Sequence, residues 1–406
     1  MNNNQLITLA EQFGTPLYVY DSNLIKQRYQ ELKEFIPHPR LRLYYAMKAN
    51  YNPHILTLLM REGAFIDAVS PAEVLLALNI GFQKEQIIFT ANMMTDEEMQ
   101  EVYQTGVLFN IGSLSELERF GKFFPGSEVC IRFNPEVVAG FHERVRTGGK
   151  DTKFGILLEN LELVKEISKK YQLKIVGVHE HTGSGIPETV DMLSGLRNII
   201  NIINQENFPD LKFVDFGGGF QIPYQENELR KDYASFGKVV IELFDECCKQ
   251  FGKELNLVFE PGRYLVAESG VLVVQVNTIK ENSNHLIVGV NSGFPQLIRP
   301  MFYNAYHKIG NLSNPKGLIK KYDVAGNICE SGDYFTVARE LPEIRVEDFL
   351  VIKDAGAYCY SMGGIYNLRA MPMEIMVNGG EVKVISKKNS NKELVENIII
   401  DSNYEI

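Results

Sequence analysis

The sequence predicts an α/β fold in which a (β/α)8 TIM barrel precedes a mostly β C-terminal domain, built as a β-barrel or sandwich. Between about residues 40 and 262, eight short runs rich in β-branched and aromatic residues alternate with helical patterns. After Arg263 the pattern changes to strands separated by turns. Eight strands over roughly 220 residues fit a closed barrel better than a doubly wound sheet.

A strand-like segment, Pro16–Tyr20, lies outside the barrel repeat, because the helical stretch Ser22–Ile36 follows it before the first barrel strand. We expect this first strand to pair within the second domain. Amphipathic segments at Pro71–Leu78, Thr95–Gln104 and Leu114–Phe123 connect barrel strands. The predicted barrel strands are Leu43–Met47, Phe65–Val69, Ile87–Thr90, Val107–Ile111, Glu128–Phe133, Ile175–His179, Lys212–Phe216 and Leu257–Glu260.

The second domain is predicted from its turns and from its alternating apolar residues. Asn378–Gly380 between two such runs is a hairpin signal. We expect residues 1–24 to join this domain, residues 25–268 to form the barrel and residues 269–406 to form the β domain. The predicted strands are Val271–Val276, His285–Val290, Tyr334–Val337, Phe349–Lys353 and the two arms of Pro372–Ser386.

The composition narrows the possible functions. A formal charge of −10 and a pI near 5.4 come without the basic stripe that nucleic-acid binding needs, so we expect no nucleic-acid partner. The first residues lack a signal-peptide pattern and no apolar run approaches about 18 residues, so we expect a cytoplasmic protein without membrane contact. The cysteines lack zinc-ligand spacing, which indicates free thiols and no metal site. They are Cys130, Cys247, Cys248, Cys329 and Cys359.

Polar residues stand at the end of every predicted barrel strand. Chemistry in such barrels sits at the carboxyl ends of the strands, so this pattern indicates an active site. One polar strand end is ordinary, but one at all eight ends is difficult to explain as a satisfied core. The residues are Lys48, Asp67, Asn92, Asn110, Arg132, His181, Gly217–Gly219 and Glu260.

Two of these positions suggest a cofactor with an aldehyde and a phosphate. Lys48 follows an apolar run that would hold its amine in the barrel mouth, where desolvation favours the neutral amine of Schiff-base chemistry. Gly217–Gly219 would present backbone N–H groups to a phosphate, with the Ser184 hydroxyl at the neighbouring strand end. Each feature has a plain alternative, because strand-end lysines are often solvated charges and glycine clusters often form simple turns.

His181 and Glu260 fit a flat heterocycle in the same place. A histidine can stack on a ring, although a lone strand-end histidine is often structural. Glu260 closes an apolar strand and needs a partner when buried. A pyridinium nitrogen would be such a partner, and its protonation lets pyridoxal phosphate (PLP) accept electrons.

The short sequence motifs that contain these residues resemble those of the fold-type III PLP-dependent decarboxylases, which share the architecture of the alanine racemases. The match runs in order over nearly the whole chain. The matching phrases are Tyr45–Asn50, His181–Ser184, Gly217–Gly219, Glu260–Arg263, Cys329–Asp333 and Asp354–Tyr358.

The resemblance implies roles for residues in these motifs. Lys48 would carry PLP, His181 would stack on the ring and Glu260 would pair with its nitrogen. The active site would lie between two subunits of a homodimer, with Cys329 and Glu330 supplied by the partner chain. The implied cofactor-binding residues are Lys48, Asp67, His181, Ser184, Gly217, Gly218, Gly219, Glu260, Gly262, Arg263 and Tyr358.

Within this family, Arg299–Tyr306 and the run from Ser361 to Arg369 resemble the diaminopimelate decarboxylases. Arg263, Arg299 and Tyr303 would hold the second carboxylate of diaminopimelate, since Arg suits bidentate carboxylate recognition. Glu330 would meet the distal amine, and Tyr358 completes the implied substrate set. Two segments depart from the pattern, Ala370–Pro372 and Ala91–Met94.

The resulting hypothesis is decarboxylation of meso-2,6-diaminopimelate to L-lysine and CO2, the last step of lysine biosynthesis. Lys48, Glu260, His181 and Cys329 would be the catalytic residues, with Cys329 as the acid that protonates Cα. The alternatives are a decarboxylase of ornithine, arginine or a carboxylated polyamine or siderophore precursor, an amino-acid racemase on the same barrel, and a non-catalytic PLP-binding homologue. A silent homologue would be expected to lose Lys48 or Cys329, and both are present.

Overall fold

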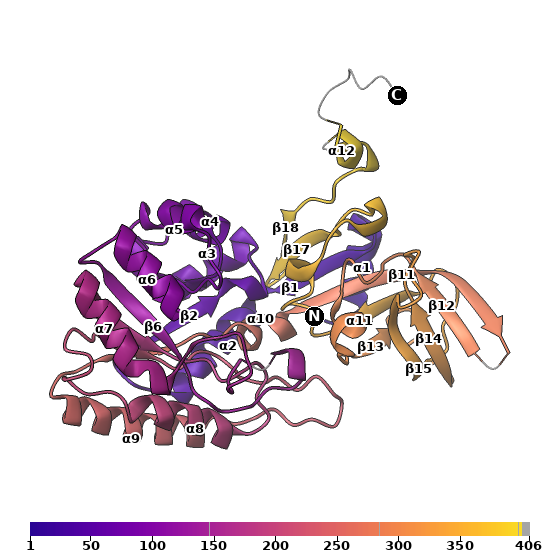
Figure 1. The fold of residues 1–406 in the computed structure, drawn as a ribbon. Helices are drawn as coiled ribbons and strands as arrows, with labels where there is room; N and C mark the ends of the chain where they lie inside the picture. The colour runs from indigo at the N-terminus through magenta and orange to yellow at the C-terminus, as the bar shows by residue number, and fades with distance from the viewer. Residues whose placement is uncertain (146, 284, 397, 400–406) are drawn as a thin grey trace. The chain divides into compact units, whose positions relative to one another are not determined.

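The computed structural model describes residues 1–145, 147–283, 285–396 and 398–399. The chain divides into two compact units, shown together in Figure 1. The first unit comprises Lys26–Ile222 and Arg230–Leu265, and the second comprises Met1–Ile25, Pro223–Leu229 and Val266–Ile406. The domain boundaries expected after residues 24 and 268 stay predictions.

The first unit is a closed barrel of eight parallel strands, which confirms the predicted fold class. Its strand order is β5-β4-β3-β2-β10-β9-β8-β6, and pairing of β5 with β6 closes the ring. A short strand that the sequence did not predict, β7 (Ile156–Leu157), pairs with β6. The barrel strands are β2 (Leu41–Ala46), β3 (Phe65–Ala68), β4 (Ile87–Phe89), β5 (Leu108–Ile111), β6 (Glu128–Asn134), β8 (Lys174–His179), β9 (Phe213–Asp215) and β10 (Asn256–Phe259).

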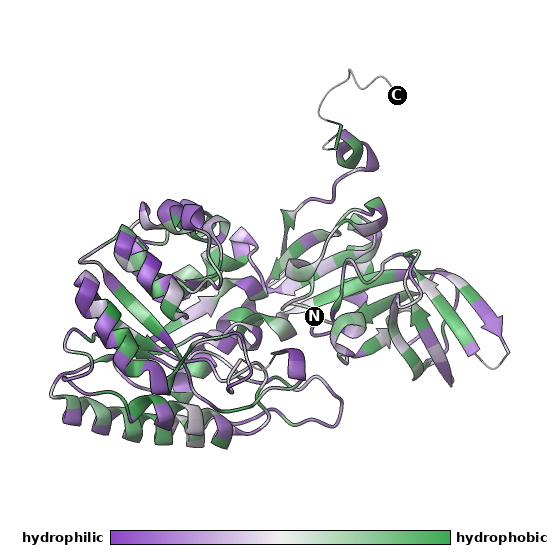
Figure 2. Cartoon of the chain, viewed as in Figure 1, coloured by the Kyte–Doolittle hydropathy of each residue, from purple (hydrophilic) through white to green (hydrophobic). Residues whose placement is uncertain are grey.

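Helices lie between and beside the barrel strands, and some of them have clear start and stop signals. Before α4, the Ser70 side chain accepts from the Glu73 N–H, and Gly81 ends the helix in the left-handed conformation. Hydrophilic and hydrophobic residues alternate along α6 and α9 (Figure 2), as expected of helices with one buried face. The helices are α2 (Ser22–Phe35), α3 (Pro53–Glu62), α4 (Pro71–Ile80), α5 (Asp96–Tyr103), α6 (Leu114–Phe123), α7 (Leu161–Tyr171), α8 (Thr189–Ile200), α9 (Ala234–Phe251) and α10 (Arg263–Val266).

The second unit is mostly β, with the strand order β15-β14-β12-β11-β1-β17-β18 in its main sheet. The N-terminal strand β1 (Leu17–Asp21) pairs antiparallel with β11 and parallel with β17, so it completes this unit as the sequence predicted. The hairpin expected at Asn378–Gly380 is also present. The strands are β11 (Gly270–Asn282), β12 (His285–Val290), β13 (Ile309–Asn311), β14 (Ile319–Ala325), β15 (Tyr334–Pro342), β16 (Phe349–Ile352), β17 (Met373–Asn378) and β18 (Glu381–Ser386).

Several elements of the second unit were not predicted. Helix α1 (Asn3–Phe13) begins with a capping box between Asn2 and Gln5 and buries Leu6 and Leu9 in the core of the unit. Strands β13 and β14 and the helix α12 (Asn391–Glu396) were also missed. The two short helices α11 (Arg299–Tyr303) and α12 have too few residues for a clear apolar period.

The five cysteines are free thiols, as predicted. Across the part of the chain that the structure describes, no helix combines the length and the apolar character needed to cross a membrane.

Gly177 in β8 tests the packing inside the barrel, because a Cβ at this position would overlap the Phe213 ring. We expect Gly177→Ala to lower the free energy of unfolding by about 1–3 kcal/mol, the usual cost of overpacking a core. Gly112 is the control, since its Cβ would meet its nearest atom at an ordinary 3.6 Å. Chemical denaturation of both variants measures the difference, and equal losses at the two positions would contradict this account.

Candidate active site

The carboxyl end of the barrel carries a polar layer directly above an apolar one. Side chains alternate between the faces of a strand, so the second residue after an inward-facing one also faces inward. Arg132 is thus the next inward-facing residue after Cys130, and Glu260 is the next one after Val258. The apolar layer consists of Tyr44, Phe65, Ile88, Leu108, Cys130, Val176, Phe213 and Val258. The next layer accordingly contains Asp67, Thr90, Asn110, Arg132, Asp215 and Glu260.

Strand β8 breaks this simple alternation. Its pairing with β6 shifts register between Ile175 and Gly177, which marks a bulge. The inward position in the polar layer therefore falls to His179 and not to Val178. His179 is fully buried and its Nε2 lies 3.0 Å from Glu260 Oε2.

Lys48 lies just after β2 and forms an ion pair with Asp67, with Nζ 2.9 Å from Oδ2. Asp67 is fully buried, whereas the Lys48 side chain is 42% exposed. The amine is therefore more accessible than the sequence predicts, and a buried carboxylate holds it at the barrel mouth. Burial raises the pKa of Asp67, and the nearby Lys48 ammonium opposes that shift.

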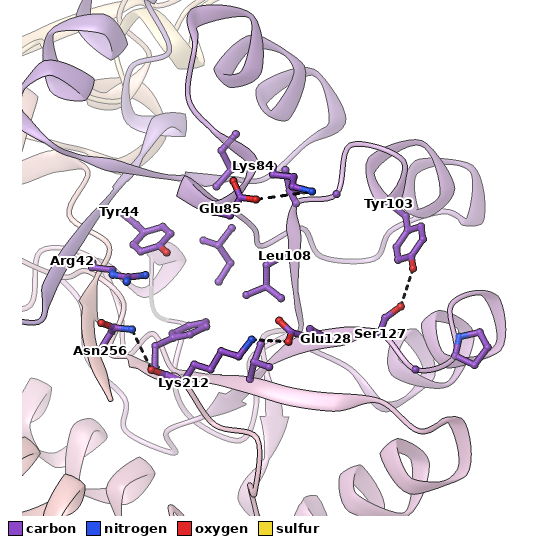
Figure 3. Close-up of a pocket in the computed structure, with 18 residues that line it drawn as sticks. Arg42, Tyr44, Lys84, Glu85, Tyr103, Leu108, Ser127, Glu128, Lys212 and Asn256 are labelled. Atoms are coloured by element: carbon purple, nitrogen blue, oxygen red, sulfur yellow. Dashed lines mark hydrogen bonds and ion pairs between the residues drawn. The ribbon is translucent and has the colours of Figure 1, made fainter. Parts of the chain in front are cut away.

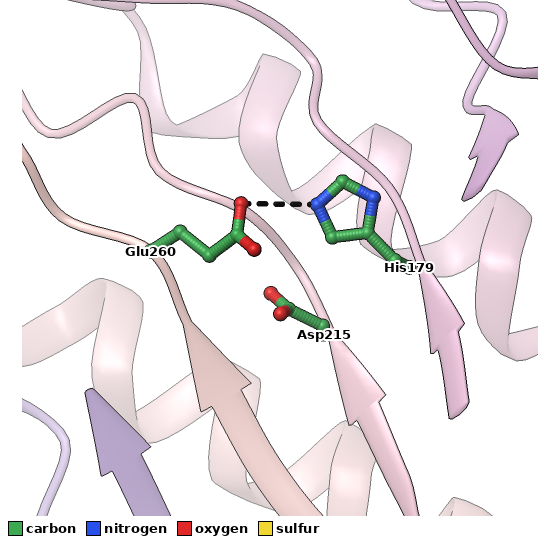
Figure 4. A group of neighbouring side chains, drawn as sticks. All are labelled: His179, Asp215 and Glu260. Atoms are coloured by element: carbon green, nitrogen blue, oxygen red, sulfur yellow. Dashed lines mark hydrogen bonds and ion pairs between the residues drawn. The ribbon is translucent and has the colours of Figure 1, made fainter. Parts of the chain in front are cut away.

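Glu260, His179 and Asp215 form a buried group, with one ligand-type atom from each lying within 4.8 Å of the others (Figure 4). Burial drives the pKa of His179 well below its usual range, so His179 is neutral. Its Nε2–H then donates to the Glu260 carboxylate. Burial raises the pKa of both acids above its usual range.

The glycine turn is held tightly against its neighbours. The Gly217 N–H donates to Asp215 Oδ1 at 2.9 Å, and the Gly218 N–H donates to His181 Nδ1 at 3.0 Å. A Cβ on Gly217 would lie 2.6 Å from the Glu180 carbonyl oxygen, and one on Gly218 would lie 2.5 Å from that of Glu260. Two of the three amides expected to face a phosphate thus have acceptors inside the protein.

Of the triplet, Gly219 offers an N–H for which the described residues supply no acceptor. The Ser184 hydroxyl accepts from Arg263 Nη2 at 3.1 Å, so two further predicted residues meet near the barrel mouth. Gly262 lies directly before α10, whose first turn includes a Leu265 N–H bond to the Gly262 carbonyl. Burial and the charges of Arg132 and Lys48 hold the pKa of His181 well below its usual range, so its ring is neutral.

Arg132 and Glu180 complete the electrostatics of the barrel interior. The Arg132 guanidinium lies 4.8 Å from the centroid of the Phe154 ring and is buried. Burial raises the pKa of Glu180 to about 8, although a hydrogen bond from Thr182 Oγ1 at 2.9 Å lowers it. Glu180 is therefore largely protonated at neutral pH.

The remaining predicted site residues belong to the second unit. Arg299 is buried, donates from Nη1 to His307 Nε2 at 2.8 Å and stacks 4.5 Å from the Tyr224 ring centroid. Its Nε has no acceptor among the described residues. Tyr303, at the other end of α11, is half-buried.

Cys329 and Glu330 are exposed on the second unit, and the Cys329 N–H donates to Asn367 Oδ1 at 2.8 Å. Tyr358 is half-buried in a left-handed backbone conformation with φ 57°. A contact between these residues and the barrel residues stays a prediction.

A cavity of about 820 Å³ lies at the amino ends of the barrel strands (Figure 3). Arg42, Glu128 and Asn256 stand at the starts of β2, β6 and β10 and line it, and Lys212 forms an ion pair with Glu128 there. Active sites of such barrels lie at the opposite, carboxyl ends of the strands, where Lys48 and Glu260 are found. The cavity is therefore separate from the candidate active site.

The barrel mouth has the polar groups that PLP requires. Lys48 presents a primary amine for the aldehyde, and Glu260 presents a buried carboxylate for the ring nitrogen. Glu260 Oε1 and His179 Nδ1 are buried without partners among the described residues, so both have unused hydrogen-bonding capacity. The Gly217–Gly219 turn leaves no room for a Cβ at its close contacts, as expected where a backbone must approach a ligand.

The model for the family "Pyridoxal-dependent decarboxylase, pyridoxal binding domain" matches residues 22–267. By fold, site and family match, the chain is thus a PLP-dependent decarboxylase. The diaminopimelate decarboxylase of Methanothermobacter thermautotrophicus is 38% identical, covering 96% of this chain and 92% of that protein. The enzyme of that name from Escherichia coli K12 is 32% identical, covering 96% and 95%. The chain therefore belongs to the diaminopimelate decarboxylase family.

A solved structure supports this assignment. The diaminopimelate decarboxylase of Helicobacter pylori, in complex with L-lysine, matches with a TM-score of 0.88 and 30% identity, covering 97% of this chain and 99% of that one. The similarity extends over both units, so the mostly β unit belongs to the family architecture as much as the barrel does.

Two residues of the site, His179 and Asp215, were missed as functional candidates in the sequence. Asp215 carries a usable signal, because it is a carboxylate two positions after the apolar Phe213 and two before Gly217, the first glycine of the triplet. His179 has no comparable signal, since the bulge in β8 decides which face its side chain takes.

Glu180 makes the stability of the cofactor-free protein depend on pH. Its pKa is about 8 in the folded protein and near 4.5 when unfolded, so the folded state retains the proton over that range. The stabilising contribution is complete below the unfolded pKa and is lost as pH rises towards about 8, at about 1.4 kcal/mol per pH unit. Glu180→Gln should reduce the decline in unfolding free energy between pH 5 and 8.

Urea unfolding at several pH values checks this expectation. Glu166→Gln, at an exposed position of α7, is the matched control and should follow the wild type. If Glu180→Gln declines with pH as steeply as the control, other groups cause the pH dependence.

Proposed function

We propose that the protein decarboxylates meso-2,6-diaminopimelate with PLP, giving L-lysine and CO2, and so performs the last step of lysine biosynthesis. The Lys48–Asp67 ion pair at the barrel mouth carries this proposal, because it places a reachable primary amine above a buried set of acids. Names of the relatives support the substrate, since they are diaminopimelate decarboxylases over nearly their full length.

PLP, when bound, supplies an aldehyde that condenses with amines and a protonated ring that accepts the electron pair left by CO2. Lys48 is the residue proposed to hold it covalently, and Asp67 orients the Lys48 amine. Glu260 keeps a negative charge opposite the ring nitrogen. His181, neutral and fixed by the Gly218 N–H, offers a flat face for the ring.

The phosphate of the cofactor would meet the Gly219 N–H, the Ser184 hydroxyl, the Gly262–Arg263 backbone and Tyr358. In this acidic protein, backbone and hydroxyl donors hold an anion without a cluster of lysines. Because Gly217 and Gly218 already donate to Asp215 and His181, their proposed contribution is the close approach that a Cβ would prevent.

Recognition of the distal end of the substrate is assigned to Arg263, Arg299 and Tyr303, which would hold the second carboxylate. Arg299 supports this role, because it is buried, always charged and has an Nε without an acceptor among the described residues. Glu330 would hold the distal amine. Positioning of this kind contributes much to the rate, since one orientation aligns the bond to be broken with the cofactor ring.

Cys329 is proposed as the acid that protonates Cα, acting from the partner subunit of a homodimer. Its exposure on the second unit, together with that of Glu330, supports a role at a subunit boundary. A biosynthetic role on a small amino acid also supports the cytoplasm as its location.

Release of CO2 by purified, PLP-loaded protein tests the function directly. Meso-diaminopimelate, L-ornithine, L-arginine and L-lysine are supplied separately, and lysine formation is followed in parallel. We expect turnover with diaminopimelate alone. Turnover confined to another of these amino acids would keep the fold and the cofactor but would overturn the substrate assignment.

Arg299→Lys sharpens the same assay, because it keeps a positive charge and removes the planar fork. We expect KM for diaminopimelate to rise about tenfold or more, the effect of losing a charged hydrogen bond. Arg339→Lys, which changes another arginine of the second unit, is the control. An unchanged KM in Arg299→Lys would remove Arg299 from the substrate site.

Mixed dimers test the shared active site. Lys48→Ala and Cys329→Ala chains are each expected to lose nearly all activity, and mixing them should restore up to one intact site per heterodimer. Subunit exchange is confirmed by differently tagged chains, and two chains that both carry Lys48→Ala serve as the control. Confirmed exchange without recovery would place Cys329 in the same subunit's site.

A further inference from the structure

The barrel interior holds more buried acids than cations. Lys48 and Arg132 are the cations that act electrostatically on these acids in the described structure. If every acid were ionised, two buried negative charges would have no counterion, which is strongly unfavourable. The buried acids, none more than 7% exposed, are Asp67, Glu180, Asp215 and Glu260.

Two of the four acids should therefore hold protons. Glu180 is one of them, given its pKa of about 8. Asp67 is paired with the Lys48 ammonium and is best ionised. The second proton must then lie on the facing pair, Asp215 and Glu260.

The unused oxygen atoms of this pair point to a shared proton. Asp215 Oδ1 accepts from the Gly217 N–H and Glu260 Oε2 faces His179. Asp215 Oδ2 and Glu260 Oε1 have no hydrogen-bond partner among the described residues. In Figure 4 the second oxygen of Glu260 is directed towards the Asp215 carboxyl. A proton between these two oxygens satisfies both.

The surroundings decide which acid keeps the proton. Burial raises the pKa of Asp215 well above its usual range, and the charge of Glu260 raises it further. Burial also raises the pKa of Glu260, but the positive charges of Lys48 and Arg132 lower it. The proton therefore belongs on Asp215.

We propose that Asp215 is protonated at Oδ2 and donates a hydrogen bond to Glu260 Oε1, which makes it a positioning residue for the Glu260 carboxylate. The inference rests on the proposed place of Glu260 opposite the cofactor ring nitrogen. His179 holds one carboxylate oxygen and Asp215 the other, so the plane and the charge of Glu260 are both fixed. Each oxygen retains a lone pair for a ring N–H.

Asp215 also links the two ends of the cofactor site. Its Oδ1 holds the Gly217 N–H at 2.9 Å, at the start of the glycine turn proposed for the phosphate. The Asp215 side chain thus fixes the position of the Glu260 carboxylate opposite the ring and the position of the glycine turn beside the phosphate. The titratable groups around it are Tyr44, Lys48, Asp67, Cys130, Arg132, His179, Glu180 and Glu260.

Comparing Asp215→Asn with Asp215→Leu shows whether Asp215 is a protonated, neutral hydrogen-bond donor or an ionised acid. An asparagine can donate from Nδ2 to Glu260 and accept the Gly217 N–H at Oδ1, so it imitates the protonated acid. We expect the PLP dissociation constant of Asp215→Asn to stay within about threefold of wild type and that of Asp215→Leu to rise about tenfold or more. If Asp215 is ionised, asparagine should weaken binding as much as leucine does, and that result would overturn the proposal.

Glu260→Gln provides the reciprocal comparison. As the acid that keeps its charge, Glu260 should not tolerate glutamine, so we expect about tenfold weaker PLP binding and a shifted pH dependence of the visible absorbance of bound PLP. Tolerance of Glu260→Gln together with failure of Asp215→Asn would put the proton on Glu260 and refute the proposal. Circular dichroism establishes that each variant is folded before binding is measured.

Infrared spectroscopy of the cofactor-free protein tests the proton without relying on binding. With isotope-labelled aspartate, a protonated carboxyl band should be present at pH 7 in the wild type and absent in Asp215→Asn. No difference between the two spectra would contradict the proposal. This measurement needs no substrate, so its failure is distinct from a failure to release CO2 from diaminopimelate.

Discussion

Strand alternation inside a closed barrel is the constraint on which the site depends. Eight parallel strands bring their carboxyl ends to one rim, and the two-residue period then decides which side chains turn inward there. An apolar layer that includes Cys130 and Val258 fills the barrel below. The next inward-facing residues, Arg132 and Glu260, therefore pack directly above apolar side chains. Charged groups that would be solvated elsewhere are held at fixed distances, and the family's cofactor chemistry uses that rigidity.

Burial at this rim determines the protonation states of the ionisable side chains. The Lys48–Asp67 pair, neutral His179 and His181, and largely protonated Glu180 together keep the interior close to electrical balance. Few of these states follow from residue type alone, because the same side chains in water would titrate near their ordinary values. In this arrangement the positive charges of Lys48 and Arg132 both act on Glu260.

Sequence reasoning predicted the barrel well because its signals are local. Leu114–Phe123 matches α6 at both ends, and Ser113 caps the start of this helix. In the second unit, β12 likewise matches His285–Val290. The misses have physical causes: the bulge in β8 turns His179 inward, and only the folded turn shows that the Gly217 and Gly218 amides already have acceptors. Lys48 was expected to be buried, but its side chain is 42% exposed beside Asp67.

The place of β1 in its sheet has a consequence for how the chain is made. Leu17 pairs with Val273 on one side and with Met373 on the other, so the middle of this sheet leaves the ribosome before the other described strands. Its neighbours are synthesised more than half a chain later, whereas the barrel strands between them pair mainly with near neighbours in sequence. Vectorial synthesis therefore favours early assembly of the barrel. Strand β1 stays unpaired until its partners β11 and β17 have been synthesised and the second unit can form.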